Sequence, residues 1–500
     1  MKKSSAIWIF FLFGAICHGQ YNYDFNDNCK EAYLSIFSLR FEEGKALLEK
    51  EKEIHPDNNI PYLLDNYIYF LTVFIGEEEG EFEKLEGLKD DIVDRLKEGD
   101  ESSPYYRYSL AQVYLQWAFA RTKFKEYVTA TFEINRAYRL LEENHEQHPE
   151  FLPSLINLGL LHTLIGTVPD NYNWIKKLVG VDGTIDQGIN EILTVMDASM
   201  KQEQYAHYKA ECVFYMSFIQ MNLMTSKQKA LDYLSLITKD TVVLKSPLSI
   251  YAISRIYMQN QMNDQAIDLL LSRPTGPEYF PFYFLDYTTG LAKLHRLDRD
   301  ANKYLFKFAI NFKGVNYIKD AYQKLAWYYL VNSDHEKYQF YLRKVELYGS
   351  TTVDADKQAQ REAESKVVPN VVLLKSRLLF DGGYYEKALG VITESESVIN
   401  LQNERDSLEL TYRKGRIFDA LGKPDQAIIY YKKTIENGAE SEFYFAANSA
   451  LKLAIIYEDR EEFENAGYYY KKAQSMENEE YKNSINQKAK AGVQRIENRK

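Results

Sequence analysis

The 500-residue sequence has little glycine, proline or cysteine, with 24 Gly, 12 Pro and 3 Cys. Glycine and proline interrupt helices and form turns, so their scarcity beside long periodic segments rich in Ala, Glu, Lys, Leu and Tyr predicts an all-α fold. Cys17 lies in the leader described below. The other two, Cys29 and Cys212, cannot form a disulfide scaffold for so long a chain. We expect two buried thiols, with a single disulfide as the alternative.

The sequence also lacks an excess of positive charge. Lys and Arg number 61 against 72 Asp and Glu, and the formal net charge is -11. Removal of Lys2 and Lys3 with the leader would take this charge from -11 to -13. Binding to nucleic acid requires a stripe of cations that neutralises phosphates. The composition therefore argues against a nucleic-acid partner.

Catalytic motifs are missing as well. The sequence has no Gly-x-Gly-x-x-Gly, no phosphate-binding loop and no Gly-x-Ser-x-Gly. The histidines of His145-Glu146-Gln147-His148 are three residues apart, whereas a zincin needs them four apart on one helix face. We expect no enzymatic activity, no cofactor and no metal site.

Residues 1–19 predict a secretory signal peptide, with a positively charged start, an apolar stretch at 6–16 and the small residues Cys17 and Gly19 at positions minus three and minus one of the cleavage site. The apolar stretch is too short to span a bilayer. Ile16 precedes Cys17 where a lipid-anchoring signal needs a small residue, which disfavours lipid anchoring. No other stretch predicts a transmembrane segment. We expect an exported protein, periplasmic or secreted, with possible envelope association.

The C-terminal third of the chain repeats itself. Ala388, Ala427 and Ala466 recur at a step of 39 residues (427 − 388 and 466 − 427). In each unit an apolar helical pattern leads to a short turn, and a second helical pattern follows, which predicts a helix-turn-helix hairpin. Close packing of the two helices requires small residues such as Gly415 opposite Ala427. A single hairpin cannot bury both its apolar faces, so neighbouring hairpins must stack.

The repeated positions resemble the signature of the tetratricopeptide repeat (TPR) family. They are Gly415, Phe418, Gly422, Ala427 and Tyr431 in one unit, and Ala454, Tyr457, Ala466, Tyr470 and Ala473 in the next. Each unit has five residues more than the usual 34 of the family. The first unit departs from the signature at Ile392 and Ser395. The resemblance implies a right-handed α-solenoid of about ten to twelve stacked helix-turn-helix hairpins that binds other proteins.

The repeat pattern divides the chain as follows. We expect degenerate TPR-like repeats over 20–348, repeats of 39-residue period over 367–481 and a polar capping helix over 482–500. Residues 349–366 break the apolar period and predict a polar linker or a solvated helix. Residues 166–184 are inserted between two helices of one hairpin. This insertion is either a binding edge or, as we favour, a plug in which Trp174, Ile175 and Leu178 cover exposed core.

The resemblance also indicates which residues face a partner. In this family the first helix of each hairpin lines the concave groove, and the residue after its small position points into it. Candidate groove residues are Arg255, Trp327, Arg377 and Arg416, with Tyr412 one turn before Arg416. Spaced guanidinium groups could hold the carboxylates or carbonyls of an extended partner. The alternative is that Arg377 pairs with Asp381, and Arg416 with Asp419, as exposed helical ion pairs do.

The favoured hypothesis is a non-catalytic scaffold of the cell envelope that binds a protein or peptide in its groove. The alternative is a secreted all-α protein that binds or degrades glycans, either a TPR lipoprotein of polysaccharide uptake or an α/α toroid. The 41 Tyr, the 27 Phe and the leader motivate this alternative.

Overall fold

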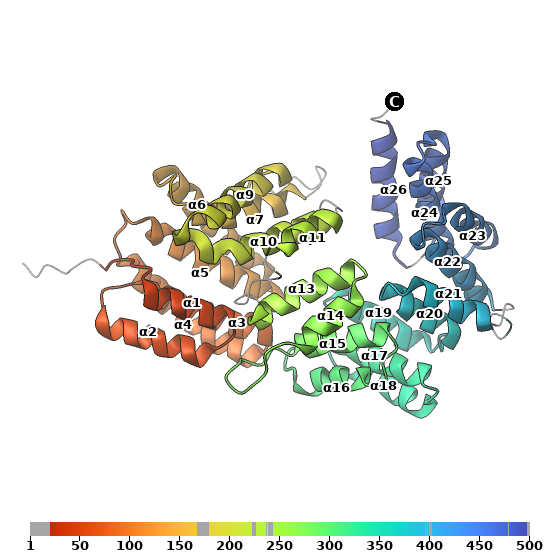
Figure 1. Ribbon diagram of the computed structural model, residues 1–500, viewed down its shortest axis with the longest axis horizontal. Coiled ribbons are helices and arrows are strands. Elements are labelled where there is room, and N and C mark those ends of the chain that lie inside the picture. Colours follow the sequence, from red (N-terminus) through yellow and green to blue (C-terminus); the bar gives the residue numbers. More distant parts are fainter. Residues whose placement is uncertain are drawn as a thin grey trace, which may run out of the picture. The chain divides into compact units, whose positions relative to one another are not determined.

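The computed structural model describes residues 21–167, 180–222, 227–236, 238, 244–395, 397, 399, 403–478 and 480–497. Within these ranges the regular structure is helical, without strands, and successive helices pack against each other (Figure 1). The predicted all-α solenoid architecture is therefore confirmed. The predicted signal peptide 1–19 and the part of the insertion at 168–179 lie outside the described residues.

The chain divides into two compact units, which are described separately. Unit 1 comprises the chain up to Ile219 together with Gly276–Phe280, and unit 2 comprises Gln220–Thr275 and Pro281–Lys500. The chain first crosses between the units within helix α10 (Lys209–Asn222) and crosses again on either side of Gly276–Phe280. The division does not coincide with 349–366, which lies inside unit 2.

The helices of unit 1 are α1 (Asp27–Phe37), α2 (Phe41–Ile54), α3 (Ile60–Gly76), α4 (Glu79–Lys97), α5 (Pro104–Lys123), α6 (Tyr127–Gln147), α7 (Pro153–Gly166), α9 (Ile185–Lys201), the 3-10 helix η2 (Glu203–Tyr208) and α10 (Lys209–Asn222), which crosses the division. Unit 2 contains α11 (Lys227–Ser235), α13 (Pro247–Gln259), α14 (Asn263–Leu271), α15 (Phe284–His295), α16 (Ala301–Asn311), α17 (Ile318–Val331), α18 (His335–Leu347), α19 (Asp354–Ser365), α20 (Val371–Asp381), α21 (Tyr385–Ser395), α22 (Glu404–Ala420), α23 (Pro424–Asn437), α24 (Phe445–Asp459), α25 (Phe463–Ser475) and α26 (Lys482–Glu497).

The hairpin of α7 and α9 in unit 1 shows why small residues recur in this chain. A Cβ atom on Gly188 would lie 2.2 Å from the carbonyl oxygen of Gly159, so the two helix backbones touch. Helix α9 begins where the Thr184 side chain accepts a hydrogen bond of 3.1 Å from the backbone N–H of Gln187. Cys29 and Cys212, also in unit 1, are buried and free.

The 39-residue repeats of unit 2 form the hairpins α20–α21, α22–α23 and α24–α25, and their repeated alanines are fully buried. The small residue of the first helix has a different neighbour from the one expected. A Cβ on Gly415 would lie 2.7 Å from the ring of Tyr431, so the glycine makes room for an aromatic ring on the second helix. In α26 a Cβ on Gly492 would lie 2.3 Å from the ring of Tyr470, the equivalent tyrosine one repeat later.

The segment 349–366, predicted as a polar linker or a solvated helix, contains the helix α19 (Asp354–Ser365). Its buried residues are Asp356, Ala359 and Ala363, and the helix packs against α17. The Asp356 carboxylate accepts backbone hydrogen bonds of 2.6 Å from Tyr317 and 2.9 Å from Asp320. Burial raises the pKa of Asp356 to about 6, although these hydrogen bonds lower it. The apolar periodicity of the sequence did not reveal this buried face, because it consists of one aspartate and two alanines rather than large apolar residues.

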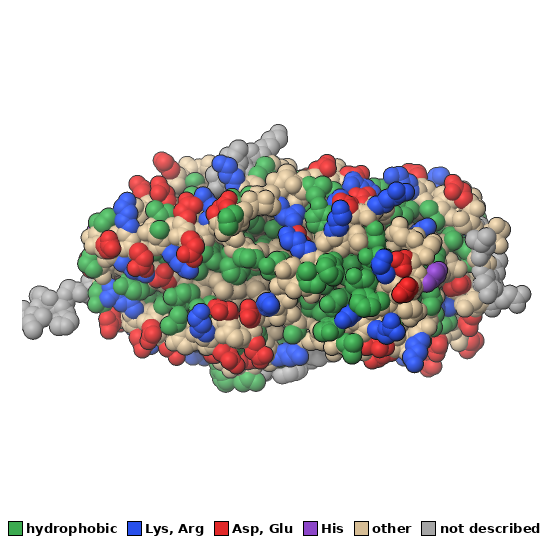
Figure 2. Space-filling view, turned by 90° about the horizontal axis from the view of Figure 1, so that it is seen from below, with side chains coloured by type: hydrophobic (Ala, Val, Ile, Leu, Met, Phe, Trp, Pro, Cys, Tyr) green, Lys and Arg blue, Asp and Glu red, His purple; other side chains and the backbone are tan. Residues whose placement is uncertain are grey.

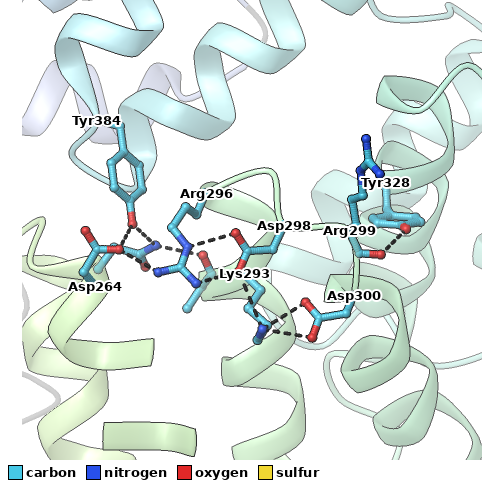
Figure 3. Close-up of polar contacts among 10 residues, drawn as sticks. Asp264, Lys293, Arg296, Asp298, Arg299, Asp300, Tyr328 and Tyr384 are labelled. Carbon is cyan, nitrogen blue, oxygen red and sulfur yellow. Dashed lines mark hydrogen bonds and ion pairs between the residues drawn. The ribbon is translucent and has the colours of Figure 1, made fainter. Parts of the chain in front are cut away.

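Polar contacts join the turns of three hairpins in unit 2 (Figure 3). Arg296, after α15, donates to Asp264 at 2.8 Å and to Asp298 at 2.7 Å. The Tyr384 hydroxyl, 120 residues after Asp264, donates to the same carboxylate at 2.8 Å. Gly383 has a φ of +83°, and a Cβ there would lie 2.5 Å from a backbone oxygen of the turn before α14. These contacts tie the α20–α21 turn to α14.

Candidate functional site: an arginine-lined groove in unit 2

Two neighbouring cavities lie along the first helices of the last hairpins of unit 2. Their volumes are about 230 Å³ and about 310 Å³. Helices α20 and α22 contribute to both cavities, and α17 and α19 to the second. The two cavities share Arg377, Arg413, Tyr444 and Tyr481 as lining residues, so they form one groove. We call this surface the arginine groove.

The smaller cavity is positively charged. Its lining includes Arg377, Arg413 and Arg416 but only one acidic side chain, Asp381. This excess of cations is notable in a chain with a net charge of -11. Three guanidinium groups around one cavity favour an anionic ligand, because each presents several N–H donors in a planar fork.

Arg416 is held in place without a carboxylate partner. Its guanidinium lies 4.6 Å from the ring centroid of Phe380 and donates a hydrogen bond of 2.8 Å to the Tyr412 hydroxyl. That hydroxyl also accepts from Asn448 at 2.7 Å. The alternative of an Arg416–Asp419 ion pair is not observed, since Asp419 accepts from Tyr431 instead. Across the described part of the chain, no ion pair neutralises Arg416.

Arg377 stands between an aromatic ring and a distant acid. Its guanidinium lies 4.8 Å from the ring centroid of Trp327. Its Nε is 3.9 Å from Asp381 Oδ2, at the outer limit of an ion pair, and both side chains are partly exposed. The proposed Arg377–Asp381 pair therefore exists, but in a geometry whose contribution to stability is small. A ligand carboxylate could compete with Asp381 for this cation.

Trp327 and Tyr412 are buried supports rather than open contact surface. Trp327 is 3% exposed and Tyr412 is 2% exposed. The Trp327 indole N–H donates to Glu362 of α19 at 2.6 Å, so α19 covers this tryptophan. Sequence register placed both residues on the groove wall, and both do line it. Their contacts show that they position Arg377 and Arg416.

Arg255, on α13, lines neither cavity. Arg255 and the groove cations act on the same buried histidine, His295, whose pKa is lowered to about 4 by burial. The charges of Lys324, Arg255 and Arg377 lower this pKa further, while Asp381 raises it. Arg255 therefore stands apart from the proposed contact residues.

Sequence reasoning missed Arg413 and Arg405, which belong to the groove lining. Arg413 Nε donates to Glu409 at 2.7 Å, and both side chains are buried. A signal was present, because Arg405, Glu409, Arg413 and Arg416 recur at spacings of 4, 4 and 3 along α22 and so share one face. The groove residues Tyr444 and Tyr481 lie outside the helices, and no repeat register identifies them.

The described residues contain no group of three or more His, Cys, Asp or Glu side chains placed to hold a metal ion. Across the same residues, no helix combines the length and the hydropathy needed to cross a membrane. The larger cavity balances its cations with four glutamates, Glu362, Glu409, Glu442 and Glu480. Recognition of negative charge between aromatic walls is therefore concentrated in the smaller cavity.

No family model matches the chain, and a search of curated proteins finds no match either. The resemblance to the TPR family therefore rests on the repeated residues quoted above.

Proposed function

We propose that the protein is a non-catalytic scaffold that binds an acidic segment of another protein or peptide in the arginine groove. The observation that carries this proposal is Arg416, a cation in the smaller cavity that is held by Phe380 and Tyr412 and has no carboxylate partner among the described residues. A guanidinium that is already paired with a carboxylate would resist an anionic ligand. Arg416 is instead oriented by an aromatic ring and a hydroxyl and forms no ion pair within the described residues, which favours such a ligand.

The shape of the groove supports an extended ligand. Its two cavities adjoin along shared residues, so one chain segment can occupy both. The walls are packed helices, which need little ordering when a ligand binds. The charge of the smaller cavity adds selectivity for anionic ligands. Its arginines attract anions locally, whereas the chain as a whole carries a net charge of -11 and repels them.

The cellular setting is part of the same proposal. The leader at 1–19 supports export to the periplasm or the cell exterior, and the repeated hairpins support a TPR-type scaffold of the envelope. The partner would then be an exported protein with an acidic segment.

The test is a pull-down from envelope extract with three forms of the chain. These are the wild type, Arg377→Ala/Arg416→Ala, and a control, Lys432→Ala/Lys433→Ala, which removes two exposed cations from α23. We expect the wild type and the control to retain one partner and the groove variant to lose it. For the partner's acidic segment, made as a peptide, affinity should fall roughly 30-fold or more in the groove variant.

Arg416→Lys separates charge from geometry, because lysine keeps the charge but lacks the planar fork. We expect an intermediate loss of affinity. Equal retention of the partner by all three forms would show that the groove is not the binding site. Retention of an oligosaccharide without any protein would favour the glycan-binding alternative.

A further inference from the structure

A second surface of unit 2 has a chemistry unlike that of the groove. It lies on the outward-facing residues of α16 and α18, the second helices of two successive hairpins, and on the residues that directly follow each helix. Its exposed apolar side chains are Phe306, Ile310, Val315, Phe340, Leu347 and Tyr348. We call it the α16–α18 face. Figure 2 views the molecule from the side of these helices, and hydrophobic side chains lie there among charged side chains of both signs.

The two helices carry the same outward pattern. Their buried positions correspond at a step of 37 residues, Leu305 with Leu342 and Phe308 with Val345 (342 − 305 and 345 − 308). At the same step Ile310 falls on Leu347, which are 55% and 71% exposed. Lys307 falls on Lys344. Both helices pack on α17, and the backbone N–H of Ser350, after α18, donates to the carbonyl of Val315, after α16, at 3.1 Å. The ends of the two stripes are therefore adjacent.

The face is basic in an acidic protein. Residues 301–317 contain Lys303, Lys307 and Lys313 and no acidic residue. Residues 334–348 add Lys337, Arg343 and Lys344 against Asp334, Glu336 and Glu346, so the two stretches hold six cations and three acids. The equivalent outer helix α14 instead exposes Asp264 and Asp268.

Several of these cations remain available to a partner. Lys307 pairs with Asp286 at 3.0 Å and Lys337 with Asp334 at 2.9 Å. In contrast, Lys303, Lys313 and Arg343 are exposed and form no ion pair within the described ranges. The ammonium group of Lys344 lies 5.3 Å from the ring centroid of Phe340 and 4.8 Å from that of Tyr348.

We propose that the α16–α18 face binds an anionic lipid surface. Phenylalanine, isoleucine and leucine side chains on one helix face can enter the boundary between head groups and acyl chains, while flanking lysines reach the phosphates. Both contributions are needed, because isolated apolar side chains on a protein surface are ordinary. A second copy of this chain fits less well, since a symmetric dimer would bring the unpaired cations of both copies together.

The experiment uses the chain from Gln20 onward and vesicles of phosphatidylcholine with or without phosphatidylglycerol, separated by flotation. We expect binding to the vesicles that contain phosphatidylglycerol, weakened by salt, and little binding to phosphatidylcholine alone. Lys303→Glu/Arg343→Glu should reduce the apparent affinity about tenfold or more. Ile310→Ser/Leu347→Ser should reduce it to a similar extent by removing the inserted side chains.

The matched control is Ile429→Ser/Lys433→Glu, which makes the same kinds of change at exposed positions of α23. It should bind vesicles as the wild type does, and all variants should keep the wild-type melting temperature. Equal vesicle binding by the wild type and both face variants would overturn the proposal. The proposal would also be overturned if the wild type formed a dimer that does not bind vesicles and if the Ile310→Ser/Leu347→Ser variant were monomeric. The α16–α18 face would then bind a second copy of the chain.

Discussion

Two carboxylates, one in each unit, have pKa values that are shifted in opposite directions. In unit 1, burial raises the pKa of Glu211 to about 7, and its hydrogen bond from the Tyr215 hydroxyl, 3.2 Å long, only partly offsets this. In unit 2, burial also raises the pKa of Glu409, but Arg413 and Arg405 bring it below its usual value. Burial is the largest cause acting on both pKa values, so the neighbours decide the direction of the net shift.

The difference reflects the chemistry of the surroundings. Glu211 lies among tyrosines, and its charge raises the pKa values of Tyr33 and Tyr108, beyond the effect of burial. Glu409 lies on the same helix face as three arginines and neutralises only part of their charge. The surroundings of Glu211 therefore favour the loss of negative charge by protonation. Those of Glu409 keep the carboxylate ionised and still leave positive charge for a ligand.

The largest effect is expected from breaking the ion pair in unit 2. Arg413→Ala leaves Glu409 buried without its main counter-ion, which should cost about 3–5 kcal/mol in the free energy of unfolding. Chemical denaturation of the variant measures this cost. Arg413→Met/Glu409→Leu removes both charges and should recover most of it. A double variant as unstable as Arg413→Ala would show that lost packing, not an unpaired charge, causes the effect.

A smaller effect should appear in the pH dependence of unit 1. The folded-state pKa of Glu211, about 7, exceeds the usual value of 4.5. The protonated form of Glu211 therefore stabilises the fold fully below the pKa of the unfolded chain, about 4.5. This contribution to the free energy of unfolding is lost as pH rises from 4.5 to about 7. The loss is at most about 3 kcal/mol. Glu211→Gln should flatten this dependence and be more stable than the wild type at alkaline pH, as urea unfolding at several pH values would show.

Glu409 should change stability with pH in the opposite direction from Glu211. Its folded pKa is lowered, so its contribution is present above the unfolded pKa and is lost as pH falls through the folded value. Glu409→Gln should therefore lower stability at neutral pH, where Glu211→Gln does not. If both variants shifted stability in the same direction at neutral pH, the contrast between the two acids would be wrong.

The 39-residue period made the hairpins of unit 2 predictable, and with them part of the groove. Register along first helices placed Arg377 and Arg416 on one wall, because positions with the same phase share a face. The burial of Trp327 was not predictable in this way. It depends on α19, whose packed face consists of Asp356 and two alanines and has no strong apolar period.

The first crossing between the two units had no sequence signal either. It falls inside α10, where a helical segment continues from Ile219 to Gln220 without glycine, proline or a charge run. The other two crossings do coincide with Gly276 and Pro281. Polar composition at 349–366 suggested a boundary, but polarity only indicates exposure. A helix can expose most of its residues and still pack inside a unit through one narrow face.

The smallest expected effect concerns the Tyr215 hydroxyl, the hydrogen bond that lowers the pKa of Glu211. Tyr215→Phe removes this donor, so the pKa of Glu211 should rise above that in the wild type, with a stability cost of about 1 kcal/mol near neutral pH. Tyr431→Phe, which loses a hydroxyl bonded to Asp419 in unit 2, is the matched control. The midpoint of the pH-dependent stability loss should move upward in Tyr215→Phe alone. An unchanged midpoint would mean that burial by itself sets the charge of Glu211, and the comparison with Glu409 would then depend on the arginines only.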